Sequence, residues 1–215
     1  VGLGGSATSD CGIGILKAMG DDWKTIRREC CFVLASDVTN PLCGENGAAH
    51  VFAPQKGADS KMVEMLDARA RKFAEVSAKH FGYDRSEAPG AGAAGGLGYA
   101  FLQYFNAKAR PGAELLLEEI GFDTLIQNAD LVITGEGHSD RQTLMGKLPQ
   151  RILEHVTNQK IWLVSGGVSD RQAMLDAGFD RVIQVTPDNM PLDVALKPDV
   201  ARNNMIKAII KEEKQ

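Results

Sequence analysis

The sequence lacks the features that mark membrane and nucleic-acid-binding proteins. None of its apolar runs is long enough to span a bilayer, and no signal peptide is visible. Its 24 basic residues are fewer than its 28 acidic ones, so the net charge is −4 and no basic patch dominates. We therefore expect no nucleic-acid partner and no membrane partner, because both are bound mainly through clustered Lys and Arg.

The sequence also has few cysteines, and they lack the spacing of a metal site. Cys30 and Cys31 are adjacent, whereas Cys11 and Cys43 stand apart from them. This pattern favours reduced thiols and a cytoplasmic protein. The 215 residues are 44% hydrophobic and 24% charged, which is typical of an ordinary globular chain with one large or two small domains.

An initiator methionine is missing as well, and the chain begins inside a glycine-rich loop, residues 2–10 (GLGGSATSD). Such loops normally follow a strand, so we expect a piece of something longer. Glycine lets backbone N–H groups approach an anion, and a helix over 8–19 would aim its positive end at the same place. The candidate anion-binding residues are Gly4, Gly5, Ser6, Thr8 and Asp10. The alternative is that Ser6, Thr8 and Asp10 only cap this helix.

The second half of the chain has an alternating strand and helix pattern. Strands are predicted over 130–134, 161–164 and 181–185, and helices over 142–156, 169–177 and 198–211. The last helix would turn Val200, Met205, Ile206 and Ile209 inward. This alternation predicts a parallel sheet. The first half is mixed, with strands predicted over 31–35 and 50–52 and helices over 59–79 and 93–107.

One polar segment, residues 36–47, follows a predicted buried strand. It offers Asp37, Asn40 and Glu45 as partners for a metal, a hydroxyl or a carboxylate, and Lys56 supplies a cation shortly downstream. The alternative is a long turn held by Asx and proline chemistry.

A second polar segment, residues 134–147, lies where a parallel strand is predicted to end, and open α/β sheets bind ligands at that edge. Glu136 and Asp140 are candidates to hold Mg²⁺ or to polarise a hydroxyl, and Arg141 and Lys147 to clamp a phosphate or carboxylate. The alternative is a solvated charged loop. The glycines of residues 90–98 have no strand before them, so they predict close packing or a loop near a ligand rather than a dinucleotide site.

Five motifs occur in the order seen in bacterial glycerate kinases of the type-1 family, which the chain resembles over nearly its whole length. They are GLGGSATSD, SDVTNPLCGENGA, FAPQKGA, APGAGAAGGLG and ADLVITGEGHSDRQTLMGK. The resemblance implies an α/β fold in which a large mixed α/β insert interrupts a flavodoxin-like parallel-sheet domain. Residues 1–127 would be the insert and 128–215 the C-terminal half of the flavodoxin-like domain, with the amino-terminal half-domain absent. The family usually has Asn at Ser9 and Arg-Ile-Asp at 138–140, so Arg141 is the candidate for a phosphate contact that the missing Arg would make.

The resemblance further implies ATP-dependent phosphorylation of D-glycerate to 2-phosphoglycerate, with Mg²⁺ as cofactor and ATP as co-substrate. Phosphoryl transfer needs a metal ion, cations around the phosphates and a carboxylate near the attacking hydroxyl. Asp37, Glu136 and Asp140 are the catalytic and Mg²⁺ candidates, and the choice of base among them stays open. Two other classes remain open: a kinase for another small hydroxy acid, and a non-catalytic folded fragment or homo-oligomer of halves.

Overall fold

The computed structural model describes residues 1–213 and has an α/β fold with parallel sheets. The chain forms two compact units, Val1–Leu115 and Leu116–Gln215. The boundary predicted between residues 127 and 128 falls inside the second unit, and the assignment of the two parts to an insert and a flavodoxin-like half stays a prediction. No helix among the described residues is long and apolar enough to cross a membrane.

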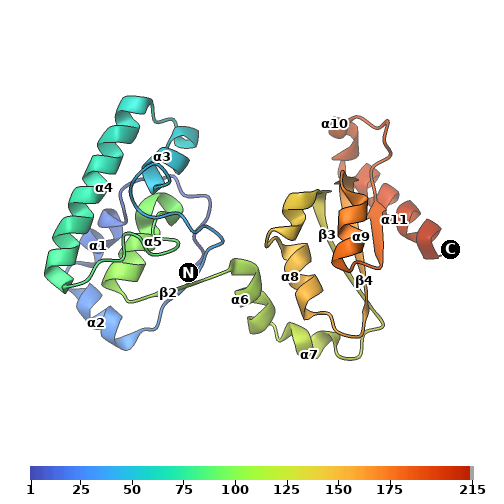
Figure 1. Cartoon of the computed structure of the whole chain (residues 1–215), viewed down its shortest axis with the longest axis horizontal. Helices are drawn as coiled ribbons and strands as arrows, with labels where there is room; N and C mark the ends of the chain where they lie inside the picture. Colours follow the sequence, from blue (N-terminus) through green and yellow to red (C-terminus); the bar gives the residue numbers. More distant parts are fainter. Residues whose placement is uncertain (214–215) are drawn as a thin grey trace. The chain divides into compact units, whose positions relative to one another are not determined.

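Unit 1 is mostly helical and contains one small parallel sheet (Figure 1). Its elements are α1 (Ile13–Met19), α2 (Asp22–Glu29), β1 (Val33–Ala35), α3 (Ala48–Phe52), η1 (Pro54–Lys56), α4 (Ser60–Phe81), α5 (Ala93–Tyr104) and β2 (Lys108–Arg110). Strands β1 and β2 pair in parallel, and Gly2 extends the pairing through a bridge to Ala35. The glycine-rich loop is therefore attached to the sheet at its start.

The long helix α4, teal in Figure 1, follows directly from its sequence. The Asp59 side chain accepts a hydrogen bond from the Met62 amide at 2.7 Å, and Gly82 ends the helix in a left-handed conformation. Val63, Ala70 and Ala74 are buried at helical spacing, which confirms the predicted helix. Residues 50–52, predicted as a strand, belong instead to α3, so that prediction was wrong. A three-residue apolar run does not define its own period, and here α3 packs Ala49 against Val63 of α4.

The glycine-rich helix α5 contains a left-handed turn near its start. Ala94, Gly95 and Gly96 all have positive φ, of 53°, 67° and 86°. A Cβ at Gly95 would lie 2.0 Å from the Thr8 carbonyl oxygen. The Gly95 carbonyl in turn accepts a hydrogen bond from the Cys11 amide at 3.1 Å. The glycines thus serve the close packing that was predicted as one of two options, and they seat the loop of residues 2–10.

Unit 2 contains a three-stranded parallel sheet in the order β3-β4-β5. The strands are β3 (Leu131–Ser139), β4 (Lys160–Val168) and β5 (Arg181–Gln184). The helices are α7 (Phe122–Ile126), η2 (Arg141–Leu144), α8 (Leu148–His155), α9 (Arg171–Ala177), α10 (Leu192–Ala195) and α11 (Pro198–Glu213), and α6 (Gly112–Glu119) spans the boundary between the units. The predicted parallel sheet is confirmed.

The two faces of this sheet have separate cores. Ile161 and Leu163 of β4 pack in a cluster that includes Ile152 of α8 and Met174 of α9. Trp162 and its neighbours pack on the other face against Ala208 and Ile209 of α11. Successive residues of β4 therefore point to opposite sides and both are buried, as parallel strands covered by helices require.

Three predicted details of unit 2 differ from the structure. Strand β3 runs on to Ser139, because Glu136 and His138 pair with Ser165 and Gly167 of β4. The helix predicted over 142–156 is divided at Gly146, which has a φ of +92°. Two residues predicted to point inward from α11 are exposed instead, Met205 by 46% and Ile206 by 49%.

The packing around Gly95 gives a stability prediction. Gly95→Ala adds a left-handed alanine, which costs about 1–2 kcal/mol, and a clash with the Thr8 carbonyl that costs about 1–3 kcal/mol more. Gly57→Ala is the matched control, because Gly57 has a φ of +94° but open space around it. We expect urea unfolding to show a clearly larger loss of stability for Gly95→Ala than for the control. Equal losses would contradict the close approach.

Candidate functional site

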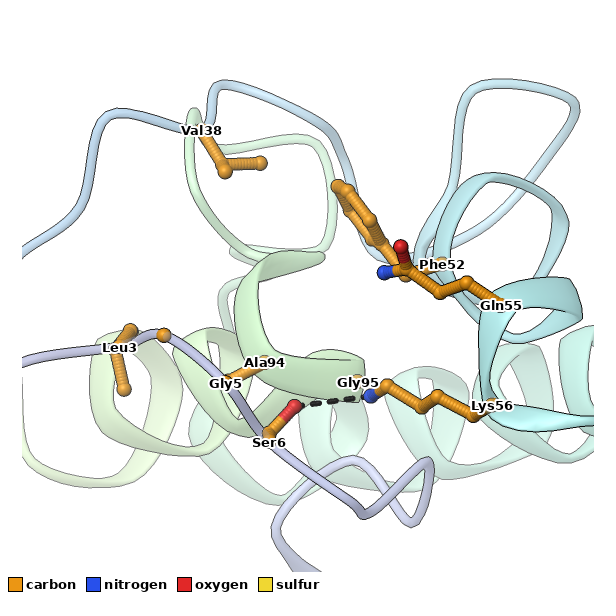
Figure 2. A pocket seen from close by; sticks show the side chains of 10 residues that line it. Leu3, Gly5, Ser6, Val38, Phe52, Gln55, Lys56, Ala94 and Gly95 are labelled. Carbon is orange, nitrogen blue, oxygen red and sulfur yellow. Dashed lines mark hydrogen bonds between the residues drawn. The ribbon is translucent and has the colours of Figure 1, made fainter. Parts of the chain in front are cut away.

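Unit 1 contains a pocket of about 450 Å³ beside the glycine-rich loop. Four separate segments line it, namely residues 3–6, Val38, Phe52 with Gln55 and Lys56, and Ala94 with Gly95. Each segment belongs to a different one of the first four motifs noted in the sequence. The fold thus collects around one opening four motifs that are separate along the chain (Figure 2).

Lys56 is the cation of this pocket. Its Nζ donates hydrogen bonds to the Ser6 hydroxyl at 2.9 Å and to the Thr8 carbonyl oxygen at 2.6 Å, and Figure 2 shows it reaching toward Ser6. Both acceptors are uncharged, so these contacts leave its positive charge unneutralised. Desolvation lowers the pKa of Lys56 from its ordinary value. A partly buried ammonium ion without a counter-charge among these partners is suited to bind an anion.

The glycine-rich loop combines the two roles that its sequence left open. The Asp10 carboxylate accepts hydrogen bonds from the Gly12 and Gly14 amides at 3.1 and 2.8 Å, so it caps the start of α1. Gly4 and Gly5 line the pocket, and a Cβ at either position would meet nothing within 4 Å. Capping therefore accounts for Asp10, and a φ of +61° favours glycine at position 5, whereas neither packing nor a positive φ requires Gly4. Anion binding by Gly4, Gly5, Ser6 and Thr8 stays a prediction that this geometry supports.

The segment of residues 36–47 is held by one local contact and by contacts to distant parts of unit 1. Asp37 is exposed, and its Oδ1 accepts a hydrogen bond from the Gly112 amide at 2.8 Å, at the first residue of α6. The Asn40 amide donates to the Asn46 carbonyl oxygen at 2.8 Å, which matches the turn alternative. Glu45 is exposed to solvent. The functional roles of the three residues stay predictions.

A buried carboxylate that the sequence analysis did not single out fixes this segment. Asp67 of α4, only 5% exposed, accepts hydrogen bonds from the Gly44 amide and the Arg71 guanidinium, both at 2.8 Å. The ion pair raises the pKa of Arg71. The available signal was the Asp67 and Arg71 spacing of four residues on a predicted helix. Asp67 thus holds the backbone of residues 36–47 in place at Gly44.

In unit 2 a polar cluster gathers where β3 ends. Glu136 accepts hydrogen bonds from the Ser139 hydroxyl at 3.0 Å and from the Thr143 hydroxyl. The Lys147 ammonium nitrogen lies 3.7 Å from a Glu136 oxygen and 3.9 Å from a carboxylate oxygen of Asp140. The sequence motif thus brings both predicted carboxylates to one predicted cation, at the edge where parallel sheets bind ligands.

The remaining residues of this segment have structural partners. The Asp140 carboxylate also accepts a hydrogen bond from the Gln142 amide at 2.8 Å, which caps η2. Arg141 is largely exposed, and its Nε lies 3.9 Å from Asp170. Among the described residues no group of three or more His, Cys, Asp or Glu side chains could hold a metal ion. Mg²⁺ commonly takes only one or two protein carboxylates and completes its shell with water and phosphate, so the metal role of Glu136 and Asp140 stays a prediction.

The chain is similar to glycerate kinases over nearly its whole length. The sequence model described as the glycerate kinase family matches residues 21–211. The glycerate kinase of Bacillus subtilis is 34% identical over 92% of this chain and 59% of its own length, and the glycerate 2-kinase of Escherichia coli is 32% identical over the same shares. The crystal structure of a putative glycerate kinase 2 from Salmonella typhimurium LT2 matches with a TM-score of 0.77 and 31% identity, covering 99% of this chain and 64% of that one. The chain therefore spans about 60% of the length of these relatives.

The pocket in unit 1 gives a binding prediction. Lys56→Ala removes its cation, so we expect the affinity for a small carboxylate anion, measured by calorimetry, to fall about tenfold or more. Lys61→Ala is the control, because Lys61 is an exposed lysine near the start of α4 outside the pocket lining. Unchanged affinity in Lys56→Ala would remove the anion role from this residue.

The lowered pKa of Lys56 predicts how anion binding in the pocket of unit 1 depends on pH. Anion binding needs the protonated amine, and this form is lost as the pH rises through the folded pKa. Because desolvation lowers that pKa, affinity should decline at a lower pH than the ordinary lysine value of 10.5 implies. A titration of affinity against pH should show this decline in the unsubstituted chain and not in Lys56→Ala.

Proposed function

Because the chain belongs to the glycerate kinase family, we propose that it carries out ATP-dependent phosphorylation of D-glycerate to 2-phosphoglycerate. The observation that carries this proposal is the convergence of four separate motifs on one pocket that contains a lysine and bare glycine backbone. Relatives named glycerate kinase and glycerate 2-kinase support the substrate and the position phosphorylated. D-Glycerate and ATP are the proposed small-molecule partners.

The pocket in unit 1 is proposed to bind the acid. Its carboxylate would face the Lys56 ammonium and the backbone of Gly4 and Gly5, where a charge-assisted hydrogen bond replaces bonds to water. The Ser6 hydroxyl, which lies against Lys56, would help to orient the acid. The apolar side chains of Val38 and Phe52, seen beside the opening in Figure 2, would exclude water from this end.

The polar cluster in unit 2 is proposed to act on the phosphates. Glu136 and Asp140 would hold Mg²⁺, which when bound neutralises charge on the phosphate oxygens. Lys147 lies within 4 Å of both carboxylates and would offset the charge that develops on the transferred group, with Arg141 as a second cation. Asp37, Glu136 and Asp140 are the candidates for the carboxylate that orients or deprotonates the attacking hydroxyl.

Membership of the glycerate kinase family also suggests how the chain is divided into domains. We propose that residues 128–215 form the C-terminal half of a flavodoxin-like domain, which the parallel order β3-β4-β5 supports, and that residues 1–127 form the insert. The cytoplasm is the proposed location, because all four cysteines are free thiols. We also propose that the chain self-associates. Light scattering would then give a molar mass above that of one chain.

A second candidate is a kinase for another small hydroxy acid. The pocket of about 450 Å³ is roomy for a three-carbon acid, so a longer hydroxy acid would also fit. The two candidates differ in which acid is turned over. A panel of hydroxy acids with ATP separates them, and an absence of turnover with every acid favours a non-catalytic folded fragment.

Charge removal at the candidate carboxylates tests the mechanism. We expect Asp37→Asn and Glu136→Gln each to lower kcat for D-glycerate phosphorylation by about 10²-fold or more, because each removes a charge that acts on the metal or the hydroxyl. Glu75→Gln on α4 is the control, since that exposed carboxylate pairs only with Lys72 in the described structure. Two folded variants with near-unchanged turnover would exclude these roles.

A further inference from the structure

A second pocket lies in unit 2, at the carboxyl ends of the sheet strands. Its volume is about 610 Å³, and β3, β4 and β5 line one side of it. Residues of α10 and α11 line the other side. This size lies within the range that holds a nucleotide-sized ligand, and the location is where open α/β sheets bind their ligands.

The chemistry of this pocket is opposite to that of the pocket in unit 1. Much of the lining is apolar, with Val164, Val185, Leu196 and Met205 among the contributors. Its charged carboxylates are Glu136 and Asp188, and no Lys or Arg among residues 1–213 lines it. A small carboxylic acid would be repelled by those carboxylates, whereas an uncharged ring would gain from leaving water.

The polar side chains at its wall are already satisfied within the protein. Gln184 donates to the Asp188 carboxylate at 2.7 Å and to the Thr186 carbonyl oxygen at 2.9 Å. His138 shares a hydrogen bond with the Ser169 hydroxyl at 2.8 Å. These groups therefore do not require a polar ligand to pair with them, and the pocket offers mainly apolar contact.

One glycine in the wall is not explained by packing. A Cβ at Gly135 would lie 2.1 Å from the Val164 carbonyl oxygen, and one at Gly166 would lie 2.5 Å from the Gly137 carbonyl oxygen. A Cβ at Gly137 would meet nothing within 4 Å. Gly135 pairs with Val164, which lines the pocket, so position 135 of β3 faces the same side of the sheet as Val164. Gly137 is two residues further along β3 and therefore faces that side as well, where it lines the pocket. Its bare backbone leaves room for a ligand there.

Glu136 connects this apolar space to a cation that lies outside the pocket lining. Glu136 lines the pocket, and Lys147 lies 3.7 Å from its carboxylate. A ligand with an apolar ring at one end and phosphates at the other would match an apolar pocket followed by a lysine. We propose that the pocket binds the adenine base of the nucleotide, with its phosphates directed toward Lys147; this inference rests on the proposed kinase function.

The proposal is tested by filling the pocket from α11. Met205 lines it and is 46% exposed, so Met205→Trp adds bulk there at a position that tolerates a larger side chain. Ile210→Trp is the matched control, because Ile210 lies on the same helix with 45% exposure and does not line the pocket. With ADP as the probe in calorimetry, we expect Met205→Trp to weaken affinity at least tenfold and Ile210→Trp to change it less than twofold.

A second variant and a second ligand complete the test. Gly137→Val fills the pocket from β3 and should weaken ADP binding in the same way, while D-glycerate affinity stays unchanged in both pocket variants. Inorganic pyrophosphate should bind much more weakly than ADP to the unsubstituted chain. No ADP binding by that chain, equal affinity for pyrophosphate, or undiminished ADP affinity in folded pocket variants would overturn the assignment.

The outcomes separate this inference from the kinase proposal. If the chain phosphorylates D-glycerate but both pocket variants bind ADP normally, the kinase function stands and the base site is elsewhere. If the variants lose ADP binding but no hydroxy acid is phosphorylated, the base site stands and the kinase function falls.

Discussion

The candidate site of unit 1 depends on how closely two backbone segments approach each other. Gly95 lies so near the Thr8 carbonyl that a methyl group would not fit between them. This contact occurs at the left-handed turn of residues 94–96, and the turn places Ala94 and Gly95 in the pocket wall. The shape of the site therefore depends mainly on backbone geometry at its glycines, and only a few side chains complete the pocket wall.

Glycine has a different effect in unit 2. There it lets β3 and β4 stay paired beyond the apolar part of each strand, through Glu136 with Ser165 and His138 with Gly167. The extension carries Glu136 out of the apolar core and up to Lys147 and Thr143. The charged cluster is thus fixed by strand pairing and short hydrogen-bonded turns, which is a more rigid support than a free loop would give.

Much of this organisation was predictable from the sequence, and the failures have physical causes. The buried runs of β4 and β5 and the capped, periodic helix α4 were predicted because local pattern and tertiary structure agree there. Residues 50–52 were mistaken for a strand because so short an apolar run has no readable period, and β3 was ended too early because glycine usually marks a turn. The positioning role of Asp67 was missed, since its Gly44 partner lies 23 residues away and only the folded chain brings the two together. The sequence singled out Gly4, Gly5, Ser6 and Lys56 of the pocket lining but not Val38, Phe52 or Gln55. It also did not show that Asp10 and Asp37 serve their neighbours as caps.

The contacts of Lys56 set a selection rule for its pocket. Its ammonium group already has two hydrogen-bond acceptors, a hydroxyl and a carbonyl, both within the glycine-rich loop. An ammonium group has three N–H donors, so these two contacts leave one for a ligand without displacing the loop. Carboxylate and phosphate oxygens form a charge-assisted hydrogen bond with it, whereas the hydroxyl of a neutral polyol forms a weaker one. The pocket therefore favours anionic ligands over uncharged ligands of the same shape.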